Sequence, residues 1–100
     1  EVEMERLPLL PGIKGMADMG LIPAGAYRNK EHSGPKVINE SKMAIFAEDL
    51  VFDPQTSGGL LIAVPAEQEQ ELLRQLHAGG FDRSVRIGKF VEGDNFIKLV

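Results

Sequence analysis

Apolar residues recur at helical spacing in three segments of the chain, and each segment carries residues that start or stop a helix. Segment 8–20 has prolines only near its start and Gly20 where a C-terminal cap belongs. Segment 41–52 begins at Ser41, a favourable N-cap, and must end before Pro54. Segment 66–78 is followed by the pair Gly79-Gly80, which stops a helix. The apolar positions are Leu9, Ile13, Met16, Ala17, Met43, Phe46, Ala47, Leu50, Leu72, Leu73 and Leu76. The spacing therefore predicts three amphipathic helices.

Shorter patterns predict strands. Residues 1–5 alternate charged and apolar side chains, which predicts a half-buried strand with Val2 and Met4 inward. Residues 60–64 form an apolar run closed by Pro65, a pattern typical of a buried strand. Residues 84–91 and 96–100 flank a polar turn and predict a terminal hairpin, with Gly88 as a candidate bulge. Residues 21–39 carry Gly, Pro and polar side chains and predict an irregular connection.

These elements predict an α+β fold, a mixed β-sheet covered by two or three helices and ending in an antiparallel hairpin. With 100 residues, 43% of them apolar, the chain predicts one folded domain, 1–100, or part of one. A net charge of −4 without a basic stripe argues against a nucleic-acid partner. The absence of cysteine excludes a disulfide framework, a thiolate zinc site and a cysteine nucleophile. No apolar run has membrane-span length, and the first residues do not resemble a signal peptide, so we expect a cytoplasmic protein without a membrane partner.

The most distinctive stretch joins the second helix to the 60–64 run, and we call residues 53–59 the 53–59 loop. It consists of Asp53, Pro54, Gln55, Thr56, Ser57, Gly58 and Gly59. The two glycines allow positive φ and close approach of a ligand, and Thr56, Ser57 and nearby N–H groups are able to line an anion-binding concavity. The other interpretation is a loop whose hydroxyls satisfy local backbone groups. The residues alone favour this second interpretation, because short glycine motifs match by chance often.

Other polar candidates favour structural roles. Arg28 and Asn29 suit a phosphate or domain contact, but a solvated charge and a turn former explain them as well. His32 has no second ligand at metal spacing and is predicted to be exposed. The three glutamates at the start of the 66–78 helix point around different sides and predict a solvated face. His77 suits a partner of the helix dipole. The sequence predicts no metal site.

The literal string Asp53-Pro54-Gln55-Thr56-Ser57-Gly58-Gly59-Leu60-Leu61 resembles the signature near the C-terminus of selenophosphate synthetase (selenide, water dikinase). That family belongs to the aminoimidazole-ribonucleotide-synthetase-like ATP-using enzymes. A second string, Gly20-Leu21-Ile22-Pro23-Ala24-Gly25-Ala26-Tyr27-Arg28-Asn29, is similar to the segment that precedes the signature in that family. The two strings also occur in the family's order.

The resemblance implies the C-terminal part of an enzyme that makes selenophosphate from selenide, ATP and water and releases AMP and phosphate. The family's nucleophile, lysine and magnesium-binding aspartates lie in segments that this sequence does not contain. We therefore assign no catalytic or metal residue here and expect this piece alone to be inactive and to bind no cofactor, with ATP and Mg in the parent enzyme. The resemblance implies a cleft-lining, cofactor-binding role for Asp53, Gln55, Thr56, Ser57, Gly58 and Gly59.

The implied partners are the N-terminal ATP-binding domain of the same enzyme, selenide as substrate, and a second copy in a homodimer. Two alternatives of other classes stay open at this point. One is an autonomous anion-binding or regulatory module that shares only this domain. The other is a structural association domain, in which the 53–59 loop merely joins helix to strand and packs on a neighbouring domain.

Overall fold

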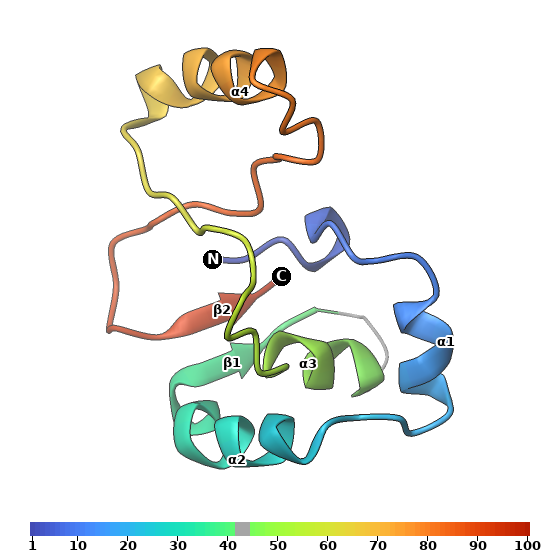
Figure 1. Ribbon diagram of the computed structural model, residues 1–100. Helices are drawn as coiled ribbons and strands as arrows, with labels where there is room; N and C mark the ends of the chain where they lie inside the picture. Colours follow the sequence, from blue (N-terminus) through green and yellow to red (C-terminus); the bar gives the residue numbers. More distant parts are fainter. Residues whose placement is uncertain (42–44) are drawn as a thin grey trace.

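The computed structural model describes residues 1–41 and 45–100. They form, in order, η1 (Met4–Arg6), α1 (Ile13–Asp18), α2 (Ala24–Ser33), η2 (Gly34–Lys36), β1 (Val37–Asn39), α3 (Ile45–Val51), η3 (Ala66–Gln68), α4 (Glu69–Ala78) and β2 (Ile97–Leu99), where η marks a 3₁₀ helix. Figure 1 shows α2 below the small sheet, α3 and α1 to the right of it, and α4 apart above it. The predicted α+β class is confirmed, whereas the sheet differs from the predicted one.

The sheet is parallel at its centre. β1 and β2 pair in parallel, with Val37 opposite Ile97 at the start of the register. The N-terminal residues extend the sheet on the far side of β2, since the Val2 amide donates to the Lys98 carbonyl at 2.7 Å and a parallel bridge joins Val2 to Leu99. The chain's two ends therefore lie side by side, as Figure 1 shows.

The predicted antiparallel hairpin of residues 84–91 and 96–100 is wrong. Residues 1–4 lie between the two predicted arms. On the side away from β2, the Glu3 amide donates to the Ile87 carbonyl at 2.7 Å, and Val2 and Gly88 form an antiparallel bridge. Each arm thus pairs with the N-terminal segment instead of with the other arm. A pattern of local alternation shows where an arm is extended, but not which neighbour satisfies its amides.

The close approach of the N-terminal backbone explains why position 88 is a glycine. A Cβ built on Gly88 would overlap the backbone carbonyl oxygen of Glu1. Close approach of another backbone, rather than the bulge suggested by the sequence, therefore accounts for the glycine.

The predicted buried strand at residues 60–64 is also wrong. The structure assigns no strand there, and Leu60 and Leu61 are 89% and 82% exposed. A strand requires a hydrogen-bonded neighbour, and the described backbone around this run supplies none. The apolar composition identifies a segment suited to burial. Which other part of the protein covers that segment does not follow from the segment's own sequence.

Among the helices, α4 follows the predicted spacing, with Leu72, Leu73 and Leu76 half-buried. α1 buries Ala17 as predicted, but Leu9 lies before it and Met16 is exposed. α1 is shorter than predicted, but its end is the predicted one: Gly20 has φ +75°, its amide donates to Ala17, and the Leu21 amide donates to Met16. Residues after α4 repeat this pattern around Gly80, which has φ +88°. Both ends are Schellman motifs, in which glycine adopts the left-handed conformation that closes the helix.

The predicted irregular connection at residues 21–39 is wrong, because it contains α2, η2 and β1. α2 buries only Ala26, so it lacks the apolar periodicity by which a helix is recognised. The predicted helix at 41–52 is confirmed from Ile45 to Val51. The predicted start of that helix after Ser41, together with Met43, lies outside the described residues.

The core is small for the length of the chain. Met4, Ala47 and Leu99 are buried together, and half-buried Val2, Leu7, Val37 and Val51 pack around them. Accessible surface is 7815 Å², whereas a compact protein of 10.9 kDa would expose roughly 5,600 Å². The surface exceeds that value by about 40%, and the large apolar residues exposed on it include residues 60–62 and Phe90. No described helix is long and apolar enough to cross a membrane.

Candidate functional site: the 53–59 loop and its junction with α2

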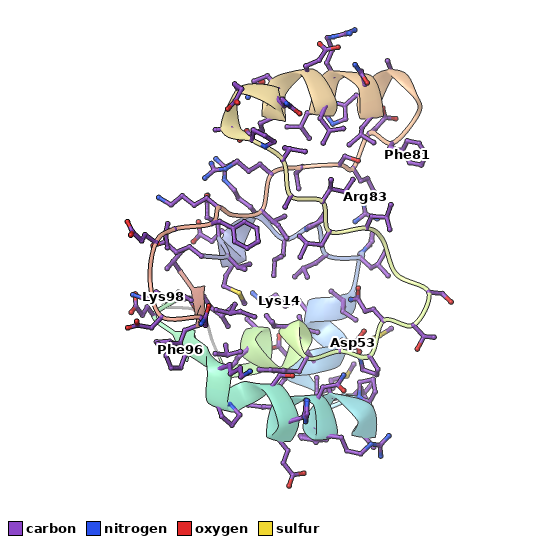
Figure 2. The ribbon with its side chains drawn as sticks, turned by 90° about the vertical axis from the view of Figure 1, so that its left-hand side faces the viewer. Lys14, Asp53, Phe81, Arg83, Phe96 and Lys98 are labelled. Atoms are coloured by element: carbon purple, nitrogen blue, oxygen red, sulfur yellow. The ribbon has the colours of Figure 1, made fainter. Side chains whose placement is uncertain are left out.

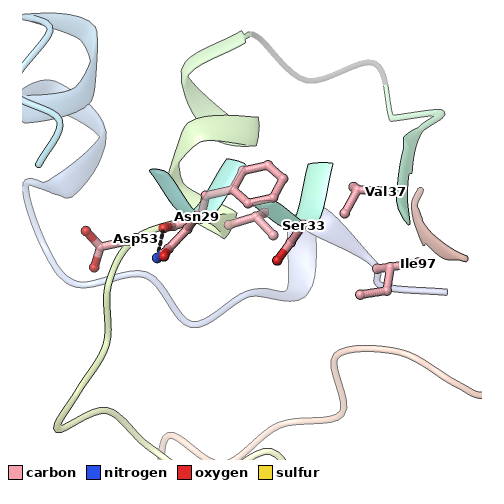
Figure 3. Close-up of a pocket in the computed structure, with 7 residues that line it drawn as sticks. Asn29, Ser33, Val37, Asp53 and Ile97 are labelled. Atoms are coloured by element: carbon pink, nitrogen blue, oxygen red, sulfur yellow. Dashed lines mark hydrogen bonds between the residues drawn. The ribbon is translucent and has the colours of Figure 1, made fainter. Parts of the chain in front are cut away.

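The 53–59 loop begins where α3 meets α2. The Asn29 side-chain amide donates to the Phe52 carbonyl at 2.9 Å, a bond drawn as a dashed line in Figure 3. One turn earlier on α2, Gly25 faces Pro54: a Cβ on Gly25 would lie 2.9 Å from Pro54 Cγ. The structure thus brings together the two strings on which the family resemblance rests, because one contributes Gly25 and Asn29 and the other contributes Pro54.

Ion pairs hold the same two helices together beside this junction. The Lys30 ammonium lies 2.9 Å from Asp49 Oδ1 and 3.1 Å from Glu48 Oε1, and 6.0 Å from the centre of the Phe52 ring. Glu48 also accepts a hydrogen bond from Asn39 Nδ2 at 2.8 Å, which ties the end of β1 to α3. These contacts connect α2, α3 and β1 on the side of the sheet where the loop starts.

The charges of this network perturb each other. The hydrogen bond to Asp49, with a further contribution from Glu48, raises the pKa of Lys30 against the opposing effect of burial. The hydrogen bond from Asn39, followed by that from Lys30, lowers the pKa of Glu48. Both shifts favour the charged forms, so Lys30 and Glu48 are both ionised near neutral pH.

A cavity of about 250 Å³ lies between α2, α3 and the sheet. The lining is mainly apolar, with Val37, Val51, Phe52 and Ile97. Its polar residues are Asn29, Ser33 and Asp53. Figure 3 shows Asp53 at one end of this lining and Val37 and Ile97 at the other. Asp53 is half-buried, and it is the one predicted site residue that lines this cavity.

The remaining predicted site residues, Gln55, Thr56, Ser57, Gly58 and Gly59, lie exposed on the surface. Figure 2 shows Asp53 beside α3, where the chain leaves on an extended path toward α4. The loop turns at its tip, with the Gly58 amide 3.3 Å from the Gln55 carbonyl. No bond joins the hydroxyls of Thr56 and Ser57 to another described residue, so they do not serve as the local backbone partners that the sequence alone favoured.

The glycines of the loop differ from their predicted role. Neither Gly58 nor Gly59 has positive φ. A Cβ on Gly58 would lie 2.9 Å from Gln55 Oε1 and 3.0 Å from Gln55 Cβ, so Gly58 makes room for the side chain three residues earlier. Gly59 has no atom within 4 Å of an added Cβ and leaves the loop open at that point.

The other polar candidates lie elsewhere. Arg28 and His32 are exposed on α2, as predicted for His32. His77 donates to the Ser84 carbonyl at 2.8 Å, a contact that ties α4 to the following segment. The α4 glutamates include Glu71, which is paired with Arg74 at 2.7 Å, and this contact lowers the pKa of Glu71. Among the described residues, no three His, Asp or Glu side chains are grouped closely enough to share a metal ion.

Sequence reasoning missed the clamp formed by Gly25, Asn29 and Lys30. The signal for it was present in the four-residue spacing of Gly25 and Asn29, which places both on one face of a helix. That signal carries meaning only once residues 24–33 are known to be helical, and their weak apolar periodicity concealed this.

These features define an α+β unit that presents a polar, glycine-bearing loop at its surface, fixed at its base by a neighbouring helix.

Comparison with known proteins finds relatives that are named selenide, water dikinase. The chain is 42% identical over 96 residues to the selenide, water dikinase of Caldanaerobacter subterraneus subsp. tengcongensis, which covers 93% of the chain and 25% of the relative. It is 36% identical over 101 residues to that of Clostridioides difficile, covering 100% of the chain and 29% of the relative. The match to that of Pelobacter propionicus is 43% over 86 residues, covering 86% and 25%. No protein-family model matches the chain, and no solved structure matches it significantly.

The resemblance to selenide, water dikinase is therefore confirmed, and it extends over nearly the whole chain. The chain spans about a quarter of the length of the curated relatives it matches. It corresponds to one portion of those longer enzymes.

Proposed function

We propose that the whole protein containing this chain makes selenophosphate from selenide, ATP and water, with AMP and phosphate as the other products. The observation that carries this proposal is the identity of 36–43% with selenide, water dikinases over 86–100% of the chain. The activity is proposed for the whole protein, because the chain covers about a quarter of those relatives. This chain is the C-terminal portion in the proposal, and the enzyme is a cytoplasmic homodimer.

We propose further that the 53–59 loop lines one wall of the nucleotide or selenide cleft. Phosphoryl transfer is catalysed largely by positioned donors and charges around the phosphate oxygens. The hydroxyls of Thr56 and Ser57 are exposed and make no bond to another described residue, so they are available as donors. The tethered base of the loop, at Phe52 and Pro54, supports this role because a donor acts best when its backbone is held in place.

The resemblance assigns ATP and Mg²⁺ to the whole enzyme. The described residues offer no grouped set of three His, Asp or Glu ligands and so do not fit a metal centre. Thr56, Ser57 and the backbone N–H groups of the 53–59 loop are the groups that fit a contact with an anionic oxygen.

Residues 1–100 form an incomplete domain in this proposal, and the rest of the same enzyme covers its exposed apolar surface. The accessible surface of 7815 Å² against the roughly 5,600 Å² of a compact protein supports this interpretation. Exposed apolar surface commonly marks contacts with other protein.

The test measures AMP formation by the purified full-length protein with and without selenide. Selenide-dependent AMP formation is the expected result, and residues 1–100 alone are expected to give none. If the full-length protein forms no AMP in response to selenide, the enzyme proposal is wrong, and the non-catalytic anion-binding or association module takes its place. If residues 1–100 alone form AMP, the assignment of catalysis to the rest of the protein is wrong.

A further inference from the structure

One face of α2 contacts the chain at the point where the 53–59 loop begins. Gly25 and Asn29 are four residues apart on this helix and therefore lie on the same face. Gly25 is adjacent to Pro54, and Asn29 is bonded to Phe52. Both contacts fall at the base of the loop, while the loop's tip is exposed.

The contact at Gly25 leaves no room for a side chain. A Cβ there would lie 2.9 Å from Pro54 Cγ and 3.3 Å from Pro54 Cβ, closer than carbon atoms normally approach. A proline ring cannot rotate away as a flexible side chain does, because its ring fixes φ. A side chain at position 25 must therefore push the Pro54 ring, and with it the start of the loop, away from α2.

The contact at Asn29 fixes the orientation of a peptide group. α3 ends at Val51, and the carbonyls near a helix C-terminus have no partner within the helix. Asn29 Nδ2 supplies a partner for the Phe52 carbonyl at 2.9 Å. Because the peptide group is planar, holding this carbonyl also fixes the direction in which the chain enters Asp53.

We propose that Gly25 and Asn29 are positioning residues, which set where the 53–59 loop lies and thereby act on substrate binding by the whole enzyme. They act through Pro54 and Phe52 and not by contact with substrate. This inference rests on the proposed function, in which the loop lines the cleft. A purely structural role would lower stability without changing kinetics per folded molecule.

The first experiment is a double-mutant cycle in the full-length enzyme, with Gly25→Ala, Pro54→Ala and the double variant. Amide hydrogen exchange of the loop, the KM for ATP, kcat and thermal stability are measured for each. Gly25→Ala is expected to raise loop exchange and KM at least threefold. Pro54→Ala removes Cγ, the closest atom that the new Cβ would meet, together with Cδ, and leaves only Cβ at 3.3 Å. Gly25→Ala is therefore expected to have a much smaller further effect in that background.

Gly15→Ala is the matched control. Gly15 lies within α1, lacks positive φ and has no atom within 4 Å of an added Cβ. Replacing a helical glycine by alanine in free space increases helix stability. The two substitutions are therefore expected to act in opposite directions, with Gly15→Ala neutral or stabilising and without effect on loop exchange or KM.

The second experiment tests the hydrogen bond. Asn29→Asp keeps the shape of the side chain and removes the donor, and Asn29→Ala removes both groups. Each is expected to raise loop exchange and KM by about 2–10-fold, the factor for one lost neutral hydrogen bond. Glu31→Ala, at an exposed position of the same helix, is the control and is expected to leave both unchanged. If Gly25→Ala fails to fold, Asn29→Asp alone decides the proposal.

The outcomes separate this inference from the proposed function. The inference is overturned if Gly25→Ala costs as much in the Pro54→Ala background as in the wild type. It is also overturned if neither Gly25→Ala nor Asn29→Asp changes KM or kcat while Thr56→Val does, in which case the proposed loop function stands. If Thr56→Val as well changes stability alone, the cleft role of the loop is wrong, and this inference fails with it.

Discussion

Gly88 shows how one residue depends on a neighbour that is distant in the sequence. The backbone of Glu1 and Val2 passes so close to it that any Cβ would overlap the Glu1 carbonyl oxygen. That backbone cannot retreat freely, because the Val2 amide is bonded to Lys98 on the opposite side. An alanine at position 88 must therefore break ladder hydrogen bonds or strain the segment.

We expect Gly88→Ala to destabilise the full-length protein by about 1–3 kcal/mol, the range for forcing extra atoms into a packed site. Thermal or urea unfolding measures the change. Gly93→Ala is the control, since Gly93 lacks positive φ and has no atom within 4 Å of an added Cβ. Equal stability of the two variants would contradict the packing of residues 87–89 against the N-terminal segment.

Thr56 tests the loop itself at the same scale. Thr56→Val keeps the shape of the side chain and removes a hydroxyl that makes no bond to another described residue. If this hydroxyl donates to an anionic substrate group, its loss costs roughly 1.5–3 kcal/mol, about tenfold to a hundredfold in kcat/KM. Steady-state kinetics of the full-length enzyme, alongside its melting temperature, make the measurement. An unchanged kcat/KM would count against the proposed donor.

Among the elements, α2 shows why a helix with little apolar periodicity still forms. It buries Ala26 and is attached to α3 by polar contacts, with Lys30 bridging Asp49 and Glu48. Such contacts contribute little individually at partly exposed positions. Several such contacts together hold α2 against α3, because the Asn29 hydrogen bond to Phe52 adds to the Lys30 ion pairs.

The Lys30 network predicts a pH dependence. The lowered pKa of Glu48 contributes stability above its ordinary value near 4.5, and this is lost as the pH falls through the lower value of the folded state. The raised pKa of Lys30 contributes stability below 10.5, which is lost as the pH rises through the higher folded value. The network is therefore complete between these limits.

Lys30→Met keeps the apolar stem and removes the charge. We expect it to cost roughly 0.5–1 kcal/mol at pH 7, a value already reduced for solvent screening. The difference from wild type should shrink below pH 4.5 as Glu48 becomes protonated, and also in 1 M salt. Urea unfolding of the full-length protein across this pH range provides the measurement. A difference independent of both pH and salt would show that Lys30 acts by packing alone.

At the scale of the whole molecule, many large apolar side chains are exposed and only a small core is buried. Residues 60–62 and Phe90 are prominent among the exposed side chains, with Phe90 91% exposed. The N-terminal segment, in contrast, offers no free backbone edge, because residues 1–4 are hydrogen-bonded along both edges. Association should therefore involve the apolar surface and not the backbone of residues 1–5.

We expect residues 1–100 in isolation to self-associate, with an apparent mass that rises with concentration in light scattering. The pair Leu60→Glu and Leu61→Glu should reduce this association, because it places charge on a highly exposed apolar run. Gln70→Glu adds a charge at an exposed polar position of α4 and serves as the control. A strictly monomeric wild type at high concentration would contradict this prediction.

The sequence alone predicted the features that depend on interactions among a few neighbouring residues. The amphipathic spacing of α4, the glycine-closed ends after α1 and α4, and the stop before Pro54 all depend on contacts within a few residues. The string from Asp53 to Leu61 likewise identified the relatives without knowledge of the fold. The sequence also located the candidate loop and predicted His32 as exposed.

Tertiary structure decided everything that depended on which distant segment is the neighbour. It placed residues 1–4 between two arms predicted to pair, left residues 60–64 without a strand partner, and set Gly25 against Pro54 and Asn29 against Phe52. A residue's own pattern states whether it prefers burial or a hydrogen bond. The group that satisfies this preference is chosen by the packing of the whole chain, since backbone amides and apolar side chains accept many partners of the same chemistry.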